Sequence, residues 1–144
     1  MLAFVGLVTL VILGPSIELS QLVFGRHTIY VHRNMPIRVD LADTPLKQKV
    51  GLSNKSVMAA GEGMLFVFDR DDKWRVWMKG MHFGLDILWL DDNGKIIDMR
   101  EYVYPDSYPN VFAPKYPAKY ILEVIAGYAS AIGLRKGDIV DVNL

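Results

Sequence analysis

The sequence predicts a mainly β protein: a single compact antiparallel β barrel or sandwich of about seven strands with one or two short helices, preceded by an N-terminal hydrophobic helix. Hydrophobic residues make up 51% of the 144 residues and aromatic residues 11%, which is typical of a packed core. Short segments alternate apolar and polar residues between turns. No regular alternation of strands with long helices is present, which argues against a doubly wound sheet. This length suits one domain.

The first segment is a candidate membrane anchor. Residues 1–17 (MLAFVGLVTLVILGPSI) contain no charged side chain, and no basic region precedes them, unlike in most cleaved signal peptides. A helix of this length spans about 25 Å, slightly less than the roughly 30 Å hydrocarbon core of a bilayer. Apolar character resumes at residues 22–25, which allows a tilted or interrupted span. We expect a signal-anchor or signal segment over residues 1–25 and a β-rich globular domain over residues 26–144, with a buried core helix as the alternative for the first segment.

After the hydrophobic segment the sequence predicts two strands and a short helix. Residues 28–33 (TIYVHR) and 36–42 (PIRVDLA) alternate apolar and polar side chains, as half-buried strands do. The helix follows in DTPLKQKVGL. Thr44 is a suitable N-cap, Pro45 fits the first helical position, and Gly51 is suited to ending the helix.

Further strands are expected along the rest of the chain. Residues 63–68 (GMLFVF) form a continuous apolar run, typical of a strand buried on both faces, and the acidic residues 69–72 (DRDD) are expected to break it. The turn DDNG joins two arms of a hairpin, with Gly94 suited to a left-handed backbone. The other expected elements are strands at residues 73–79, 85–90, 95–104, 118–127 and 136–144, and a helical turn at residues 128–134.

One long connection is rich in tyrosine and proline. Residues 102–120 carry five of the seven tyrosines and four of the seven prolines, and proline keeps such a segment out of a central strand. Its tyrosines, Tyr104 and Tyr108 among them, could offer flat faces for stacking on a sugar ring or a peptide. Alternatively, the connection folds over one end of the sheet and its tyrosines cover the core.

Composition and spacing exclude several classes of site. Sixteen basic and sixteen acidic residues cancel, so we expect no nucleic-acid partner. The absence of cysteine excludes disulfides, thiolate catalysis and thiolate metal sites. The three histidines have no paired metal-ligand spacing, the serines have no nucleophile-elbow context, and the acidic turns lack a complete calcium loop. We therefore expect neither a bound metal nor a cofactor.

Three polar residues interrupt the apolar stretch WMKGMHFGLDILWL: Lys79, His82 and Asp86. If residues 85–90 form a strand, Asp86 shares its face with two leucines. A buried carboxylate must be paired or hydrogen-bonded, because desolvating it alone is costly. Lys79 is a candidate partner, and the two would then form a charge pair that brackets a hairpin.

Glu123 resembles Asp86, because apolar residues flank it on both sides in YILEVIAG. Two carboxylates among apolar side chains could form an acid–base pair with separated pKa values. They could equally be two structural anchors, each held by its own partner. An enzyme would require both carboxyl groups to open into one cleft.

Several ordered motifs resemble one bacterial and archaeal family. GLSNKS, GEGMLFVF, WMKGMHFGLDILWLDDNGKII, YPAKYILEVIAG and GLRKGDIV follow, in order, the pattern of the domain of unknown function 192 family, over about Ile37 to Val142. Ser53 stands where the family typically has methionine, and Gly80 and Met81 replace asparagine and threonine. The residues that match the family pattern are Trp77, Met78, Lys79, Leu85, Asp86 and Glu123.

The resemblance implies a single small β-rich domain that is often exported behind a signal or membrane anchor, and it implies no activity. Arg26, Arg33 and Arg38 follow the hydrophobic segment, and this charge bias alone favours a cytoplasmic domain. The resemblance outweighs the bias. We therefore expect a single-pass protein of the cytoplasmic membrane with its domain outside the cytoplasm.

Three functions are compatible with these features, and a binding domain is favoured over an enzyme. The first is a membrane-anchored extracytoplasmic binding or accessory domain for an envelope glycan or protein partner. The second is a hydrolase-type enzyme that uses Asp86 and Glu123, and the third is a purely structural assembly domain. The binding site is expected where the charged residues of the apolar stretch approach the tyrosine-rich connection. Its candidate residues are Trp77, Lys79, Asp86, Tyr104, Tyr108 and Glu123.

Overall fold

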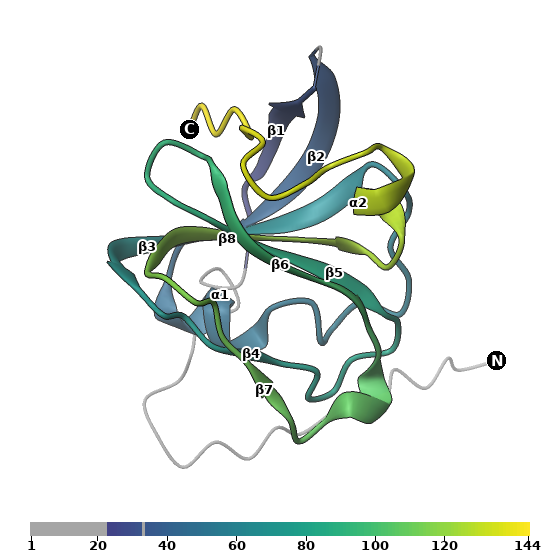
Figure 1. Cartoon of the computed structure of the whole chain (residues 1–144). Helices are drawn as coiled ribbons and strands as arrows, with labels where there is room; N and C mark the ends of the chain where they lie inside the picture. The colour runs from purple at the N-terminus through teal and green to yellow at the C-terminus, as the bar shows by residue number, and fades with distance from the viewer. Residues whose placement is uncertain (1–22, 33) are drawn as a thin grey trace, which may run out of the picture.

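The computed structural model describes residues 23–32 and 34–144, which form a mainly β domain (Figure 1). Six strands form one sheet in the order β1-β2-β3-β8-β5-β6, and β4 and β7 form a separate two-stranded ladder. Two short helices, α1 and α2, and a single 3-10 turn complete the described elements. The element bounds are β1 Arg26–Val31, β2 Met35–Ala42, α1 Pro45–Val50, β3 Glu62–Asp72, β4 Val76–Trp77, β5 Leu85–Leu90, β6 Ile96–Val103, η2 Pro105–Ser107, β7 Val111–Phe112, β8 Ala118–Ile125 and α2 Tyr128–Ala131.

The hydrophobic segment expected over residues 1–25 lies outside the described residues, apart from its last three positions. Within the part of the chain that the structure does describe, no helix is long and apolar enough to cross a membrane.

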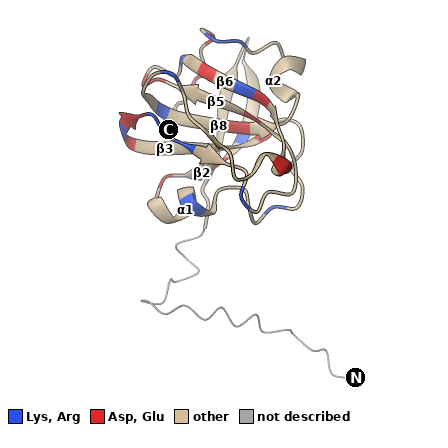
Figure 2. Ribbon diagram, turned by 60° about the horizontal axis from the view of Figure 1, so that its bottom comes forward, with Lys and Arg blue, Asp and Glu red and all other residues tan. Residues whose placement is uncertain are grey.

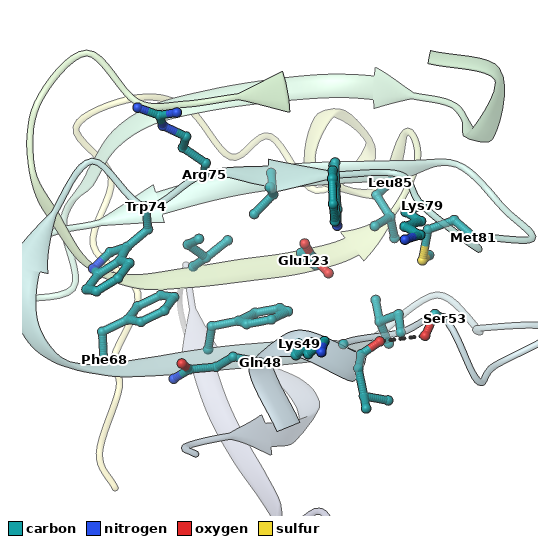
Figure 3. Close-up of a pocket in the computed structure, with 17 residues that line it drawn as sticks. Gln48, Lys49, Ser53, Phe68, Trp74, Arg75, Lys79, Met81, Leu85 and Glu123 are labelled. Carbon is teal, nitrogen blue, oxygen red and sulfur yellow. Dashed lines mark hydrogen bonds between the residues drawn. The ribbon is translucent and has the colours of Figure 1, made fainter. Parts of the chain in front are cut away.

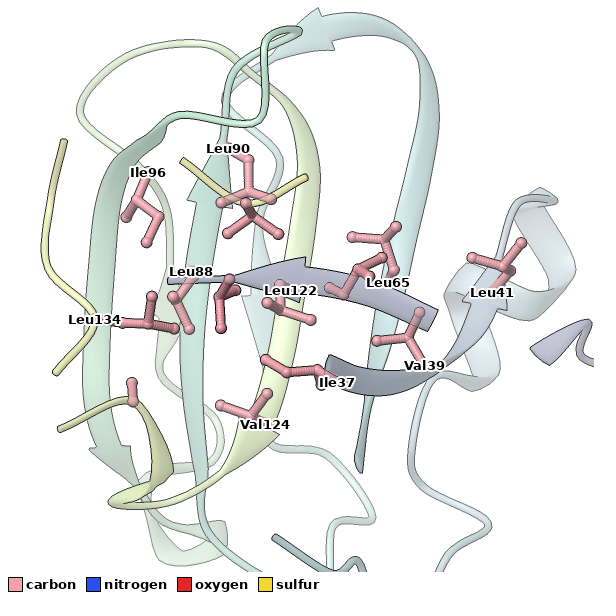
Figure 4. Close-up of a cluster of buried hydrophobic side chains, with 14 residues drawn as sticks. Ile37, Val39, Leu41, Leu65, Leu88, Leu90, Ile96, Leu122, Val124 and Leu134 are labelled. Atoms are coloured by element: carbon pink, nitrogen blue, oxygen red, sulfur yellow. The ribbon is translucent and has the colours of Figure 1, made fainter. Parts of the chain in front are cut away.

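The sheet separates two hydrophobic cores, because its central strands bury side chains on both faces. All six residues of β5 are buried, and their alternation distributes them between the two faces as expected. Figure 4 shows part of the first core, in which Ile37 and Val39 of β2 lie near Leu122 and Val124 of β8. The first core includes Ile37, Val39, Leu65, Leu88, Leu122 and Val124, and the second includes Met64, Phe66, Leu85, Ile87, Trp89 and Ile121.

The C-terminal segment joins the two outer strands of the sheet. Asp141 exchanges two backbone hydrogen bonds with Tyr30 of β1, and Ile139 forms an isolated bridge with Lys95 beside β6. Val140 donates to the carbonyl oxygen of Gly94. The expected strand over residues 136–144 is thus reduced to two isolated bridges, and the sheet does not close into the barrel that the sequence suggested.

Gly94, in the turn before β6, accepts the hydrogen bond from Val140. Its φ is +77°, a left-handed conformation that favours glycine. A Cβ atom at this position would overlap the carbonyl oxygen of Val140. Glycine therefore serves both the left-handed turn, as expected, and the close approach of the C-terminal segment.

One part of the topology differs from the antiparallel arrangement that we expected. β2 and β3 are parallel, and α1 lies in the crossover between them. Parallel strands require a connection of about a dozen residues or more, and residues 43–61 supply it. The sequence signals for α1 are confirmed: Thr44 accepts a hydrogen bond from the backbone N–H of Lys47, and Pro45 begins the helix.

Two strand boundaries also differ from expectation. β3 continues through the acidic residues 69–72, which were expected to break it, and pairs again with β8 after a register shift. The strand expected at residues 73–79 is shorter than predicted, since only Val76 and Trp77 have strand structure. These two residues pair with β7 and not with the large sheet.

Candidate functional site

A cavity of about 270 Å³ lies on the second-core face of the sheet (Figure 3). Its floor comes from β3, β5 and β8, and one side comes from α1 and the turn that follows it. The other side comes from residues 74–81, which include β4. Because β4 pairs with β7, the tyrosine-rich connection is fastened to this side of the cavity.

Aromatic rings form one end of the cavity. Phe68 and Trp74 stack with their ring centroids 4.0 Å apart and an interplanar angle of 8°. The backbone carbonyl of Trp74 accepts a 2.9 Å hydrogen bond from the indole N–H of Trp89, which is fully buried in the second core. The guanidinium of Arg70 lies 5.2 Å from the Trp74 ring centroid. These contacts hold the aromatic end in a defined position against the sheet.

Glu123 extends from β8 into this cavity (Figure 3). The residue is only 6% exposed, and its carboxyl group makes no hydrogen bond or ion pair within residues 23–32 and 34–144. Every fully buried side-chain oxygen or nitrogen in that part of the chain has a partner. The oxygens of Glu123 must therefore be open to the cavity. Burial disfavours the charged carboxylate and raises the pKa of Glu123 to about 8.

Three cationic side chains surround the cavity: Lys49 on α1, and Arg75 and Lys79 on the opposite side. All three are exposed, and none forms an ion pair with a carboxylate of the described chain. Figure 3 shows Lys49 and Lys79 on opposite walls near Glu123, whereas Arg75 points away from it. The ammonium group of Lys79 lies 5.3 Å from the Trp77 ring centroid.

Trp77 lines the cavity and is 52% exposed, so it contributes to the opening. Its ring meets Tyr108 edge to face, with the centroids 5.8 Å apart. Tyr104 does not line the cavity: its ring lies over Gly84, so closely that a Cβ atom there would overlap it. Among the six candidate site residues, Trp77, Lys79 and Glu123 thus line the cavity, Tyr108 contacts Trp77, and Tyr104 packs on Gly84.

The tyrosines of the connection do not cover the core as one interpretation expected. Tyr102, Tyr104, Tyr108 and Tyr116 are each between 42% and 56% exposed. Tyr120, which lies in β8, alone packs against the first core. The pairing of β4 with β7 is one of the contacts that hold the connection in place.

Asp86 is the candidate that the structure removes from this site. Its side chain is completely buried and accepts hydrogen bonds from the backbone N–H of Tyr102, at 2.9 Å, and of Ala129, at 3.0 Å. The carboxylate thereby joins the end of β6 to the first turn of α2, where Gly127 is the N-cap and provides no side chain. The expected charge pair with Lys79 is absent from the described chain, and the partners of Asp86 are these two backbone N–H groups.

Asp86 and Glu123 lie on opposite faces of the sheet. In the pairing of β5 with β8, Asp86 is opposite Val124 of the first core, whereas Glu123 is opposite Ile87 of the second core. Residues opposite each other in an antiparallel pair share a face. The two carboxyl groups therefore cannot open into one cleft, and the expectation of an acid–base pair is wrong.

Sequence reasoning missed two features that the structure places near the sheet. Phe68 and Trp74 were not considered for the site, because the acidic residues between them suggested only a solvent-exposed break in the strand.

The second missed feature is Asp98. It is 3% exposed and binds the ammonium of Lys136 at 2.7 Å and the backbone N–H groups of Met99 and Lys115. Burial opposes the ionisation of Asp98, but Lys136 and the backbone donors outweigh it and lower the pKa. This carboxylate is fully occupied and joins β6 to two connections.

Basic and acidic residues are interspersed over the described chain (Figure 2). The described residues contain no group of three or more histidine, aspartate and glutamate side chains arranged to hold a metal ion. The groups that the cavity offers to a ligand are aromatic rings, one acid without a partner in the described chain, and exposed cationic side chains.

Two crystal structures resemble this fold. One is a protein of Sinorhizobium meliloti described as a candidate transcription regulator; it is 28% identical, with a TM-score of 0.78 over 82% of this chain and 94% of that chain. The other, from Novosphingobium aromaticivorans, is a protein of unknown function; it is 24% identical, with a TM-score of 0.76 over 81% of this chain and 84% of that chain. The second likeness supports the fold alone. A comparison with curated proteins found no match.

The family to which the sequence motifs pointed also matches directly. The model of the domain of unknown function 192 family, described as Uncharacterized ACR, matches residues 28–142, which include the whole sheet except the first two residues of β1. The chain therefore belongs to the domain of unknown function 192 family.

Proposed function

We propose that this protein is a membrane-anchored binding domain that works outside the cytoplasm, and that the cavity around Glu123 is its binding site. The observation that carries the proposal is a nearly buried acid without a partner in the described chain, open to a cavity with an aromatic end. An unpartnered buried acid lowers stability, so its presence in a cavity favours a functional role. A purely structural assembly domain would have no need of such a cavity.

The ligand is proposed to come from the cell envelope, as a glycan or as part of a protein partner. The exposed Trp77 and Tyr108 suit either, because both rings can stack on a sugar or an apolar side chain. The inner lining is mainly apolar, which favours the protein or peptide ligand, since each sugar hydroxyl that is buried requires a hydrogen-bond partner. The description of the Sinorhizobium protein as a candidate regulator is not transferred, because the balanced charge of this chain gives no electrostatic reason to expect DNA binding.

Replacing Trp77 by alanine is expected to weaken ligand binding about ten-fold or more, because it removes a large exposed ring at the opening of the cavity. Full-length protein in detergent would be tested against a glycan array and against purified envelope peptides. Tyr116→Ala is the matched control, since Tyr116 is 56% exposed but does not line the cavity. Absence of binding by the unmodified protein, or equal losses in both variants, would contradict the proposal.

The membrane anchor is proposed from the uncharged residues 1–17. A reporter enzyme that is active only outside the cytoplasm, fused after Leu144, is expected to be active and to sediment with the membrane fraction. Deletion of residues 1–22 should abolish both results. A reporter that stays inactive in the full-length fusion would place the domain on the cytoplasmic side and refute this part of the proposal.

A further inference from the structure

We propose that the cavity binds a small zwitterionic ligand with an apolar body, such as an α-amino acid or a dipeptide. The ammonium group of the ligand pairs with the carboxylate of Glu123, and its carboxylate faces Lys49 and Lys79. Its apolar body lies against the aromatic end of the cavity. The inference rests on the proposed function, in that it requires the cavity to be a ligand site.

The position of Glu123 indicates the positive group of the ligand. Its carboxyl group is open to the cavity yet has no partner in the described chain. An ammonium group that enters the cavity would supply both the opposite charge and the hydrogen-bond donors that a carboxylate needs. Burial raises the pKa of Glu123 to about 8 in the empty cavity, so binding of an amine should ionise the acid and release a proton.

The lining of the cavity indicates the apolar body. Phe66, Phe68 and Trp74 line it together with aliphatic side chains from β5 and β8. Its volume of about 270 Å³ exceeds the roughly 150 Å³ of an engineered protein cavity that holds benzene. A body of one aromatic ring or a branched aliphatic chain, with two small polar groups, is therefore compatible with the space.

The amines at the walls indicate the negative group of the ligand. Lys49 and Lys79 are exposed, lack carboxylate partners in the described chain, and lie on opposite sides of the space that Glu123 enters (Figure 3). Together with Arg75 they would repel an amine that carried no other charge. A carboxylate on the ligand compensates this repulsion, so a zwitterion complements the site better than a simple amine does.

A ligand with only a carboxylate is the competing possibility, because a protonated Glu123 could donate a hydrogen bond to it. The two possibilities differ in their pH dependence. An amine ligand requires ionised Glu123 and should bind more tightly as the pH rises from 6 to 8, whereas a carboxylate ligand should bind more weakly. The other charged groups that line the cavity with Glu123 are Lys49, Arg75 and Lys79.

The test compares four probes that share one aromatic ring: phenylalanine, phenethylamine, 3-phenylpropionate and phenylalanylglycine. Isothermal titration with the full-length protein in detergent is expected to show phenylalanine or phenylalanylglycine binding about ten-fold or more tightly than phenethylamine and 3-phenylpropionate. Tighter binding of phenylalanine assigns the site to a free amino acid, and tighter binding of phenylalanylglycine assigns it to a dipeptide.

Glu123→Gln should reduce the affinity for the tighter probe about ten-fold or more and abolish its increase between pH 6 and 8. Glu101→Gln, which changes an exposed acid that does not line the cavity, is the matched control and should leave both unchanged. Selective binding of 3-phenylpropionate, equal binding of phenethylamine, or no binding of any probe would overturn the inference. In each of these cases, a glycan or peptide that still binds and is lost in Trp77→Ala would leave the proposed function intact.

Discussion

Replacing Asp86 by alanine is expected to lower the free energy of unfolding by about 3–5 kcal/mol. The substitution strands the backbone N–H groups of Tyr102 and Ala129, both of which donate to this buried carboxylate in the native protein. It also disconnects the end of β6 from the first turn of α2. Urea denaturation followed by tryptophan fluorescence would measure the loss, provided that the m-value is unchanged.

Asp86→Asn separates the charge from the shape of the side chain. Its amide has one oxygen that can accept and one nitrogen that cannot, so only one of the two backbone donors keeps its partner. We expect a smaller loss than for alanine. Asp106→Ala removes an exposed acid and should change stability by less than about 0.5 kcal/mol. A loss in Asp86→Ala no larger than that of Asp106→Ala would refute an anchoring role for Asp86.

Glu123→Gln is expected to stabilise the protein increasingly as the pH rises from about 4.5 to about 8. Below pH 4.5 the glutamate is protonated in both the folded and the unfolded chain, and the two proteins should be about equally stable. Between the unfolded pKa of 4.5 and the folded pKa of about 8, only the unfolded chain loses the proton. The wild type therefore loses roughly 1.4 kcal/mol of stability per pH unit in this window, and the loss is complete above it.

The difference between the two proteins should thus approach about 3–5 kcal/mol at pH 8. Unfolding free energies of both proteins would be measured at half-unit intervals from pH 4 to pH 9. Because all other titrating groups are shared, the difference isolates Glu123. A pH-independent difference would mean that the carboxyl group is not desolvated, and would also weaken the case for an ammonium partner.

Several elements could be predicted because their signals are local. Thr44, Pro45 and Gly51 mark the two ends of α1 within one short segment, and the alternation within β5 assigns its residues to the two faces without knowledge of any neighbour. The left-handed Gly94 is likewise a property of one turn. The parallel pairing of β2 with β3 could not be predicted in this way, because it depends on which distant strands meet and not on any residue pattern within them.

In the candidate site, too, the sequence predicts local properties but not contacts between residues that are distant along the chain. The apolar neighbours of Asp86 and Glu123 correctly indicate that both acids are buried. The partners of Asp86 are backbone N–H groups, which every residue other than proline carries, so the sequence offers no signal for them. Whether Glu123 has a partner is decided by the packing of α1 and residues 74–81 over β8, which sequence periodicity does not describe.

The junction of the C-terminal segment with the outer strands affects how the protein behaves in concentrated solution. An outer strand with free N–H and C=O groups is a template on which a second molecule can add a strand, and this is a common route to aggregation. Asp141 occupies part of that template on β1, and residues 138–140 do so beside β6. A truncated form that lacks residues 137–144 would therefore expose the outer edges of both β1 and β6 and tend to self-associate. An extension fused after the exposed Leu144 would leave both edges covered.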